Sequence, residues 1–161
     1  MTLLVEAAVL CALFTLPVLA MSKDPLKTLY NYPPKIQQRV KSLPEYDGRV
    51  PTRKKKITVK LTACLLFIMI LSLVLRYINK CVSFPQAFLT GFLLWTAVNL
   101  FDLVVLDILW FCHDPRFVLP GTEDMVSDYH DYGFHLRGFF IGEGLALAVC
   151  CAAALVVRYL L

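Results

Sequence analysis

The chain has 161 residues, of which 58% are hydrophobic and 17% are charged, and its mean hydropathy is +0.66. This composition excludes an ordinary soluble domain and indicates a polytopic membrane protein. A membrane-spanning helix takes about 20 residues, so four spans and their connectors use up the chain. We therefore predict an all-α fold, a four-helix transmembrane bundle with a cytoplasmic polar cap, which forms one domain over residues 1–161.

The first apolar run covers residues 2–21 and is predicted to form the first span. A signal peptide is the alternative, because the tripeptide at 18–20 resembles a cleavage site. The run has no Lys or Arg before it, contains Glu6, and is followed by a strongly basic segment. These features favour a retained transmembrane helix. Glu6 lies near the outer end of this helix, where we expect its side chain to reach the headgroups.

Residues 22–57 form a polar connector with ten Lys or Arg residues. Pro34 is expected to begin a short helix with Ile36, Val40 and Leu43 on one side. This helix would lie on the membrane surface, with its basic side toward anionic headgroups. The basic run at the end of the connector is interpreted as a topology signal, and binding of phosphorylated substrates is the alternative. No nucleic-acid partner is expected for a basic run beside a span.

The second span is predicted over residues 58–77 and the third over 87–112, joined by a short turn at 78–86. This turn makes the two helices antiparallel neighbours. Because basic loops stay in the cytoplasm, the first connector is predicted to be cytoplasmic and both termini to lie outside. The expected location is therefore a multi-pass position in the cell membrane.

The third span carries Asn99, Asp102 and Asp107, with His113 just after its end. On an ideal helix Asn99, Asp102 and His113 share one face, whereas Asp107 falls to the other side of Asn99. A carboxylate that faces lipid costs roughly 2.5–3.5 kcal/mol at the bilayer centre. We therefore predict that this helix turns its polar groups toward the other helices.

The second connector, residues 113–133, leads into the last span at 134–161. Thr122 is a good candidate for a helix N-cap. The helix that begins there is expected to run toward the last span, and Gly133 is the only plausible break between them.

The third and last helices are expected to run antiparallel, so depth follows from the rise of about 1.5 Å per residue. Asp102 and Glu143 would lie at similar depth near the middle of the membrane, with Asp107 closer to the cytoplasm. His135 would lie near the mouth, where Asp131, four residues earlier, has the spacing that lets a carboxylate orient an imidazole. If the two helices touch, these groups form a polar column.

These positions give three sets of candidate site residues. The first set consists of acid–base or catalytic groups, namely Asp107, His113, His135 and Glu143. The second would bind the substrate, with Arg137 holding an anionic headgroup, and consists of Asn99, Asp102, Trp110 and Arg137. The third would ligate a divalent metal ion, the one cofactor considered, and consists of Asp107, His113, Asp131 and His135.

The leading functional hypothesis is a small membrane enzyme that acts on an amphiphilic or lipid-like substrate at the cytoplasmic mouth between helices three and four. The first alternative is an ion- or proton-coupled transporter or channel component, since intramembrane carboxylates often carry ions. The second is a non-catalytic accessory subunit of a larger membrane complex. Membrane lipid, an anionic small molecule, further copies of the chain and a larger membrane protein are the partners considered. The motifs of P-loop proteins, dinucleotide-binding proteins, α/β-hydrolases and zinc metalloproteases do not occur.

Overall fold

The computed structural model describes residues 3–50 and 53–161, and no β-strand occurs in these two ranges. Four helices in this part of the chain are long and apolar enough to cross a membrane. The predicted all-helical fold with four long apolar helices is therefore confirmed. The four helices are α1 (Leu3–Met21), α3 (Arg53–Leu73) with its extension η3 (Val74–Ile78), α4 (Phe84–Phe101) with its extension η4 (Asp102–Phe111), and α6 (Tyr132–Tyr159).

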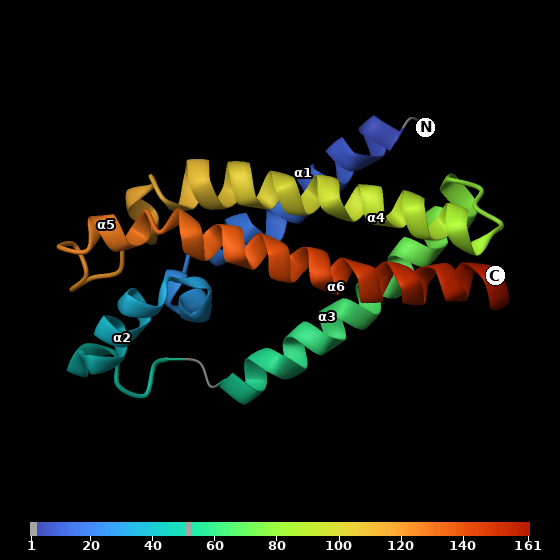
Figure 1. Ribbon diagram of the computed structural model, residues 1–161. Helices are drawn as coiled ribbons and strands as arrows, with labels where there is room; N and C mark the ends of the chain where they lie inside the picture. The colour runs from blue at the N-terminus through green and yellow to red at the C-terminus, as the bar shows by residue number, and fades with distance from the viewer. Residues whose placement is uncertain (1–2, 51–52) are drawn as a thin grey trace.

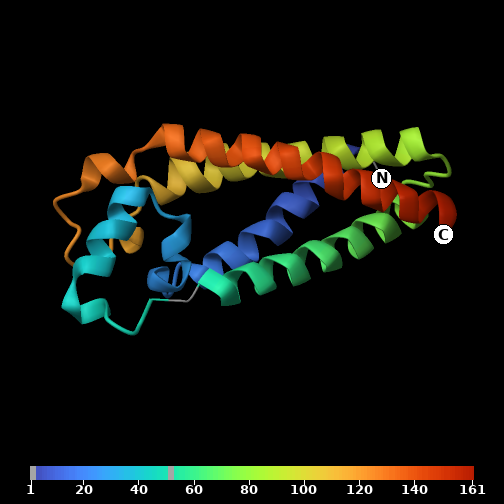
Figure 2. The ribbon, with the colours of Figure 1, turned by 60° about the horizontal axis from the view of Figure 1, so that its bottom comes forward.

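Helices α4 and α6 run antiparallel and side by side along the length of the molecule (Figures 1 and 2). Helix α3 packs mainly on α6, and α1 packs on α4. The core between α3, α4 and α6 contains many small side chains, which let the backbones approach closely. At Gly91 an added Cβ would lie 3.3 Å from the Leu75 side chain and 3.6 Å from Cys150 Sγ. The fully buried small residues of this core include Ala87, Cys150, Ala153 and Ala154.

Two of the long helices change to π-helical geometry near one end, which the sequence pattern did not predict. The segments are η3 after α3 and η4 after α4. In a π-helix each N–H bonds to the carbonyl five residues earlier, as Cys112 N does to Asp107 O at 3.0 Å. Residues five apart therefore return toward one face, and Asp102 and Asp107 are such a pair.

The two connectors fold together into a cap at one end of the bundle, and both chain ends lie at the opposite end (Figure 1). The cap has its own apolar core, which includes Leu29, Ile36 and Tyr129. Hydroxyl groups of buried tyrosines join the connectors: Tyr32 donates to Phe117 O at 3.0 Å, and Tyr46 donates to Pro120 O at 2.9 Å. The short helices of the cap are η1 (Pro25–Asn31), α2 (Pro34–Ser42), η2 (Pro44–Tyr46), η5 (Pro115–Phe117) and α5 (Val126–Tyr129).

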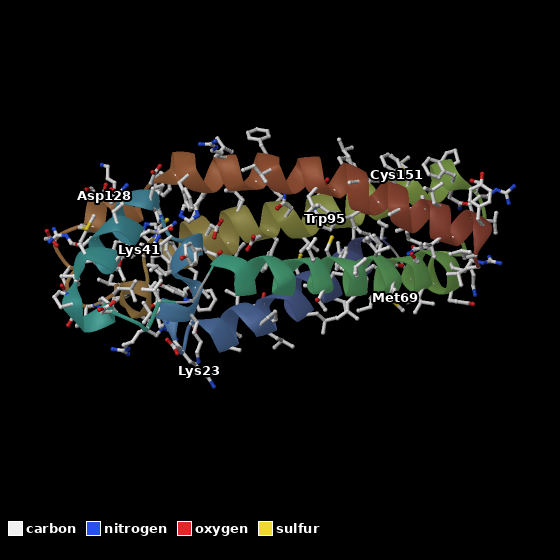
Figure 3. The ribbon with its side chains drawn as sticks, turned by 90° about the horizontal axis from the view of Figure 1, so that it is seen from below. Lys23, Lys41, Met69, Trp95, Asp128 and Cys151 are labelled. Atoms are coloured by element: carbon white, nitrogen blue, oxygen red, sulfur yellow. The ribbon has the colours of Figure 1, made fainter. Side chains whose placement is uncertain are left out.

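Helix α2 begins at Pro34 as expected, but the prediction that its apolar side faces a membrane surface is wrong. Ile36 and Val40 are fully buried in the cap core. Its basic side chains meet acids of the second connector, with Lys35 Nζ 2.8 Å from Asp128 Oδ1 and Arg39 2.7 Å from Asp124. Figure 3 labels Lys41 and Asp128 at this end of the molecule. The amphipathic pattern of α2 therefore serves contacts within the cap.

The expected start of the last helical segment is also corrected. Thr122 does not cap a helix; its hydroxyl donates to Leu119 O at 2.6 Å and bonds to Tyr129 Oη at 2.7 Å inside the cap. The predicted break at Gly133 lies earlier, at His130 and Asp131, and Gly133 belongs to the first turn of α6. Helix α3 begins at Arg53, so the basic run expected at the end of the first connector belongs to that helix.

Candidate functional site

A cavity of about 770 Å³ lies where α1, η1, η4 and the first half of α6 meet, next to the cap. Its volume is in the range of pockets that hold small molecules, about 300–1,000 Å³. Its lining combines apolar and aromatic side chains with charged and polar groups, so the cavity suits an amphiphile. Its apolar lining includes Phe14, Pro17, Val18, Leu103, Leu106, Phe111, Phe134 and Ile141, and its polar lining includes Thr28, Asn99, Asp102, Asp107, His135 and Arg137.

One contact between ionisable groups in the cavity wall joins η4 to α6. Asp107 Oδ2 lies 3.0 Å from His135 Nδ1, with the His135 side chain 3% exposed and the Asp107 side chain 34% exposed. The rings of Phe111 and Phe134 lie against the imidazole, at centroid distances of 5.3 and 5.4 Å. His135 Nε2 is buried and has no hydrogen-bond partner among the described residues.

Asp102 and Arg137 complete the charged part of the wall. Five residues separate Asp102 from Asp107, and on an ideal α-helix these two would diverge. The π-helical turn of η4 returns both to the cavity side. Asp107 was predicted to lie apart from Asp102 because α-helical geometry was assumed for the whole span.

Asn99 and Glu143 form a second polar cluster further along the α4–α6 contact. Asn99 Nδ2 donates to Glu143 Oε1 at 2.8 Å and to Phe139 O at 3.0 Å, and Thr96 Oγ1 donates to Glu143 Oε2 at 2.8 Å. Asn99 also lines the cavity, whereas Glu143 does not. Both carboxylate oxygens of Glu143 are thus held by neutral donors within the helix pair.

Besides Glu143, three of the predicted site residues lie outside the cavity lining and have structural contacts. Trp110 Nε1 donates to Asp114 Oδ2 at 2.7 Å. His113 is exposed, and its Nδ1 lies 2.8 Å from Ile108 O. Asp131 caps α6 by accepting a hydrogen bond from Phe134 N at 3.0 Å.

The structure does not support the predicted metal centre. Within the ranges described, no group of three or more His, Cys, Asp or Glu side chains is placed to hold a metal ion. Of the four residues predicted as ligands, Asp107 and His135 are in contact. His113 lies against Ile108 O, and Asp131 caps α6. The predicted contact between Asp131 and His135, which are four residues apart, does not form. Instead, Asp107 from the neighbouring helix lies against Nδ1 of His135.

Two features of the site region were missed from the sequence. The first connector contributes a wall of the cavity through Thr28, Tyr30 and Tyr32, and none of these three was among the predicted site residues. The prediction that Glu6 reaches the headgroups is wrong: Glu6 is only 3% exposed, and neither carboxylate oxygen has a hydrogen-bond partner in the described part of the chain. The signal for Glu6 was present, since an acid within an apolar run is costly to leave in lipid.

Comparison with known protein families, curated proteins and solved structures found no match to this chain. Its function is therefore inferred from the chemistry of the cavity.

Proposed function

We propose that the protein is a small integral-membrane enzyme that acts on an amphiphilic substrate held in this cavity. The observation that carries the proposal is the contact between Asp107 and His135 in the wall of an amphipathic cavity. A carboxylate at one nitrogen of a buried imidazole fixes the tautomer and leaves the other nitrogen for proton transfer.

In the proposed reaction His135 is the general base. With the Nδ1 proton directed at Asp107 Oδ2, 3.0 Å away, Nε2 carries the lone pair and takes a proton from a substrate hydroxyl or amine, or from a water molecule. Asp107 then stabilises the imidazolium that forms. Phe111 and Phe134 shield Nε2 from water, and we expect these rings to move when the substrate enters. General base catalysis of this kind contributes about 10²–10⁴-fold to rate.

The mixed lining of the cavity accounts for the substrate class. The tail would lie along the apolar wall provided by α1 and η4, which includes Phe14, Val18 and Leu106. Arg137 would hold an anionic headgroup near the Asp107–His135 pair. The basic first connector supports a cytoplasmic position for the cap and for the mouth of the cavity.

A second candidate function is proton or ion transport, and one observation favours it. Asn99 links the cavity to Glu143 through a 2.8 Å hydrogen bond, so polar groups continue from Asp107 and Asp102 into the α4–α6 contact. Intramembrane carboxylates in such a series often form proton paths. In this case Glu143 would exchange protons with the cavity.

The proposal is tested with the purified protein in vesicles. The vesicles are made from the total lipid extract of the membrane from which the protein was purified. Mass spectrometry then follows which lipid species are consumed. We expect wild-type protein to convert one species, and His135→Gln to lower the rate by at least about 10²-fold. Asp107→Asn is expected to lower it as well, because Nδ1 loses its carboxylate.

A matched pair of glycines on α6 provides the control. Gly138 lines the cavity, Gly144 does not, and an added Cβ meets nothing within 4 Å at either position. Gly138→Phe should fill the cavity and abolish turnover, whereas Gly144→Phe should leave turnover unchanged. Equal rates in wild type, His135→Gln and Gly138→Phe would reject the enzyme. A proton flux that is lost in Glu143→Gln, without lipid conversion, would favour transport.

A further inference from the structure

Two contacts fix how the continuous helix α4–η4 is aligned with α6 beside the cavity. Asp107 Oδ2 lies 3.0 Å from His135 Nδ1, and Asn99 Nδ2 donates to Phe139 O at 3.0 Å. The two helices run in opposite directions between these contacts (Figure 1). Residues that fall between the two contacts, on either helix, therefore lie at a similar depth along the bundle.

One negative and one positive side chain of the cavity wall lie in this interval. Asp102 of η4 and Arg137 of α6 both fall between the two contacts, and both line the cavity. No ion pair joins Arg137 to Asp102 or to Asp107, three residues that the structure describes. Next to Arg137, a Cβ added at Gly138 would meet nothing within 4 Å. The cavity thus presents opposite charges at one level, with open space beside them.

The two charges together select among ligand headgroups. A charge held away from water is costly unless an opposite charge meets it. A headgroup that carries both signs can pair with Arg137 and with Asp102 at once. A purely anionic headgroup would bring like charges together at Asp102, and a purely cationic one would do so at Arg137. Such repulsion is how a site rejects the wrong partner.

We propose that the cavity binds a zwitterionic amphiphile, with Arg137 holding its phosphate group and Asp102 its ammonium group. The guanidinium of arginine matches the geometry of phosphate oxygens. The acyl chains lie along the apolar side chains of α1 that line the cavity, which include Phe14 and Val18. A phospholipid with a phosphoethanolamine headgroup has this chemistry. The inference rests on the proposed function, since it names the substrate class of the same cavity.

Native mass spectrometry of the protein in detergent tests the headgroup. The protein is offered equal amounts of three lipids with the same two oleoyl chains: zwitterionic phosphatidylethanolamine, anionic phosphatidylglycerol and a cationic trimethylammonium lipid. Gly138→Phe fills the cavity, so the lipid that this variant loses, and Gly144→Phe keeps, is the cavity-bound fraction. In wild type we expect this fraction to favour the zwitterionic lipid at least about tenfold. An equal share of the anionic lipid would overturn the proposal.

Single variants assign the two charges. Asp102→Asn should raise the share of the anionic lipid in the cavity-bound fraction, because the carboxylate that repels it is gone. Arg137→Gln should raise the share of the cationic lipid for the same reason. Arg158→Gln is the matched control, since Arg158 lies near the far end of α6, over the Tyr159 ring and outside the cavity lining. Shares that stay at wild-type values in both cavity variants would overturn the proposal, and the wild-type comparison decides it if a variant does not fold.

Two further results separate this inference from a soluble ligand and from the enzyme. Glycerophosphoethanolamine has the headgroup without acyl chains, so it should not displace the bound lipid at equal concentration; displacement would reject an amphiphile. Binding is measured without turnover. A zwitterionic preference without lipid conversion would reject the enzyme and keep the binding site. Conversion of an anionic lipid that depends on His135 would keep the enzyme and overturn this inference.

Discussion

Gly142 provides a sharp test of the α4–α6 packing. An ideal Cβ at this position would lie 2.7 Å from Asn99 Oδ1 and 2.9 Å from Asn99 Nδ2, both shorter than real Cβ contacts. The Asn99 amide cannot turn aside freely, because Nδ2 donates to Phe139 O at 3.0 Å and to Glu143 Oε1 at 2.8 Å. Gly142→Ala therefore forces either a backbone shift or the loss of these hydrogen bonds.

The expected cost follows from three contributions. Overpacking typically costs 1–3 kcal/mol, and hydrogen bonds between membrane helices contribute about 0.6 kcal/mol each. Replacing Gly by Ala within a helix returns up to about 1 kcal/mol. We expect Gly142→Ala to lower the free energy of unfolding by roughly 2 kcal/mol, as the balance of these three contributions.

Equilibrium unfolding in detergent micelles, followed by tryptophan fluorescence, measures this quantity. Gly144→Ala is the control, since its Cβ meets no atom within 4 Å, and it should be neutral or slightly stabilising. In an Asn99→Ala background the cost of Gly142→Ala should vanish, because the colliding amide is gone. Equal stability of Gly142→Ala and Gly144→Ala, or an unchanged cost without Asn99, would refute this account of the packing.

Three further predictions concern the cap. Tyr32→Phe removes a buried hydrogen bond to the second connector and should lower cap stability by about 1–3 kcal/mol, measured by amide hydrogen exchange; unchanged exchange would contradict the contact. Gly121→Ala should cost more than Gly48→Ala in the same assay. Both glycines have positive φ, at +79° and +69°, but only at Gly121 does an added Cβ meet a leucine side chain, at 2.7 Å. Finally, the Arg116 guanidinium beside Asp114 holds the pKa of that carboxyl well below its usual range. Its contribution to cap stability should be complete above the unfolded-state pKa of about 3.9 and lost as pH falls toward the folded-state value. Asp114→Asn should remove this acid-dependent step from a hydrogen-exchange titration, and a step that persists in the variant would contradict the assignment.

The long helices were predicted well, because each contains an apolar run that is long enough to cross a membrane. It predicted α2 from Pro34 and the spacing of Ile36 and Val40, but it assigned the apolar side to the membrane surface. A short amphipathic helix looks the same whether it lies on lipid or on a second connector. Only the fold brings Leu119 and Tyr129 against that side.

The candidate site was predicted in part. Asn99, Asp102, Asp107, His135 and Arg137 were all selected from the sequence, and all line the cavity. The partner of His135 could not be predicted, because Asp131 and Asp107 are both within plausible reach and the π-helical turn that presents Asp107 leaves no recognisable pattern. Glu143 was predicted at the right helix contact, but its hydrogen bonds to Thr96 and Asn99 depend on how α4 and α6 are rotated about their axes.

The most direct test of the account is the tautomer of His135, measured by ¹⁵N NMR on protein labelled at its three histidines. His135→Gln assigns the signal. We predict that wild-type protein at neutral pH carries the proton on Nδ1 with Nε2 unprotonated, and that Asp107→Asn abolishes this preference. A neutral His135 with its proton on Nε2, unchanged by Asp107→Asn, would contradict the proposed general base.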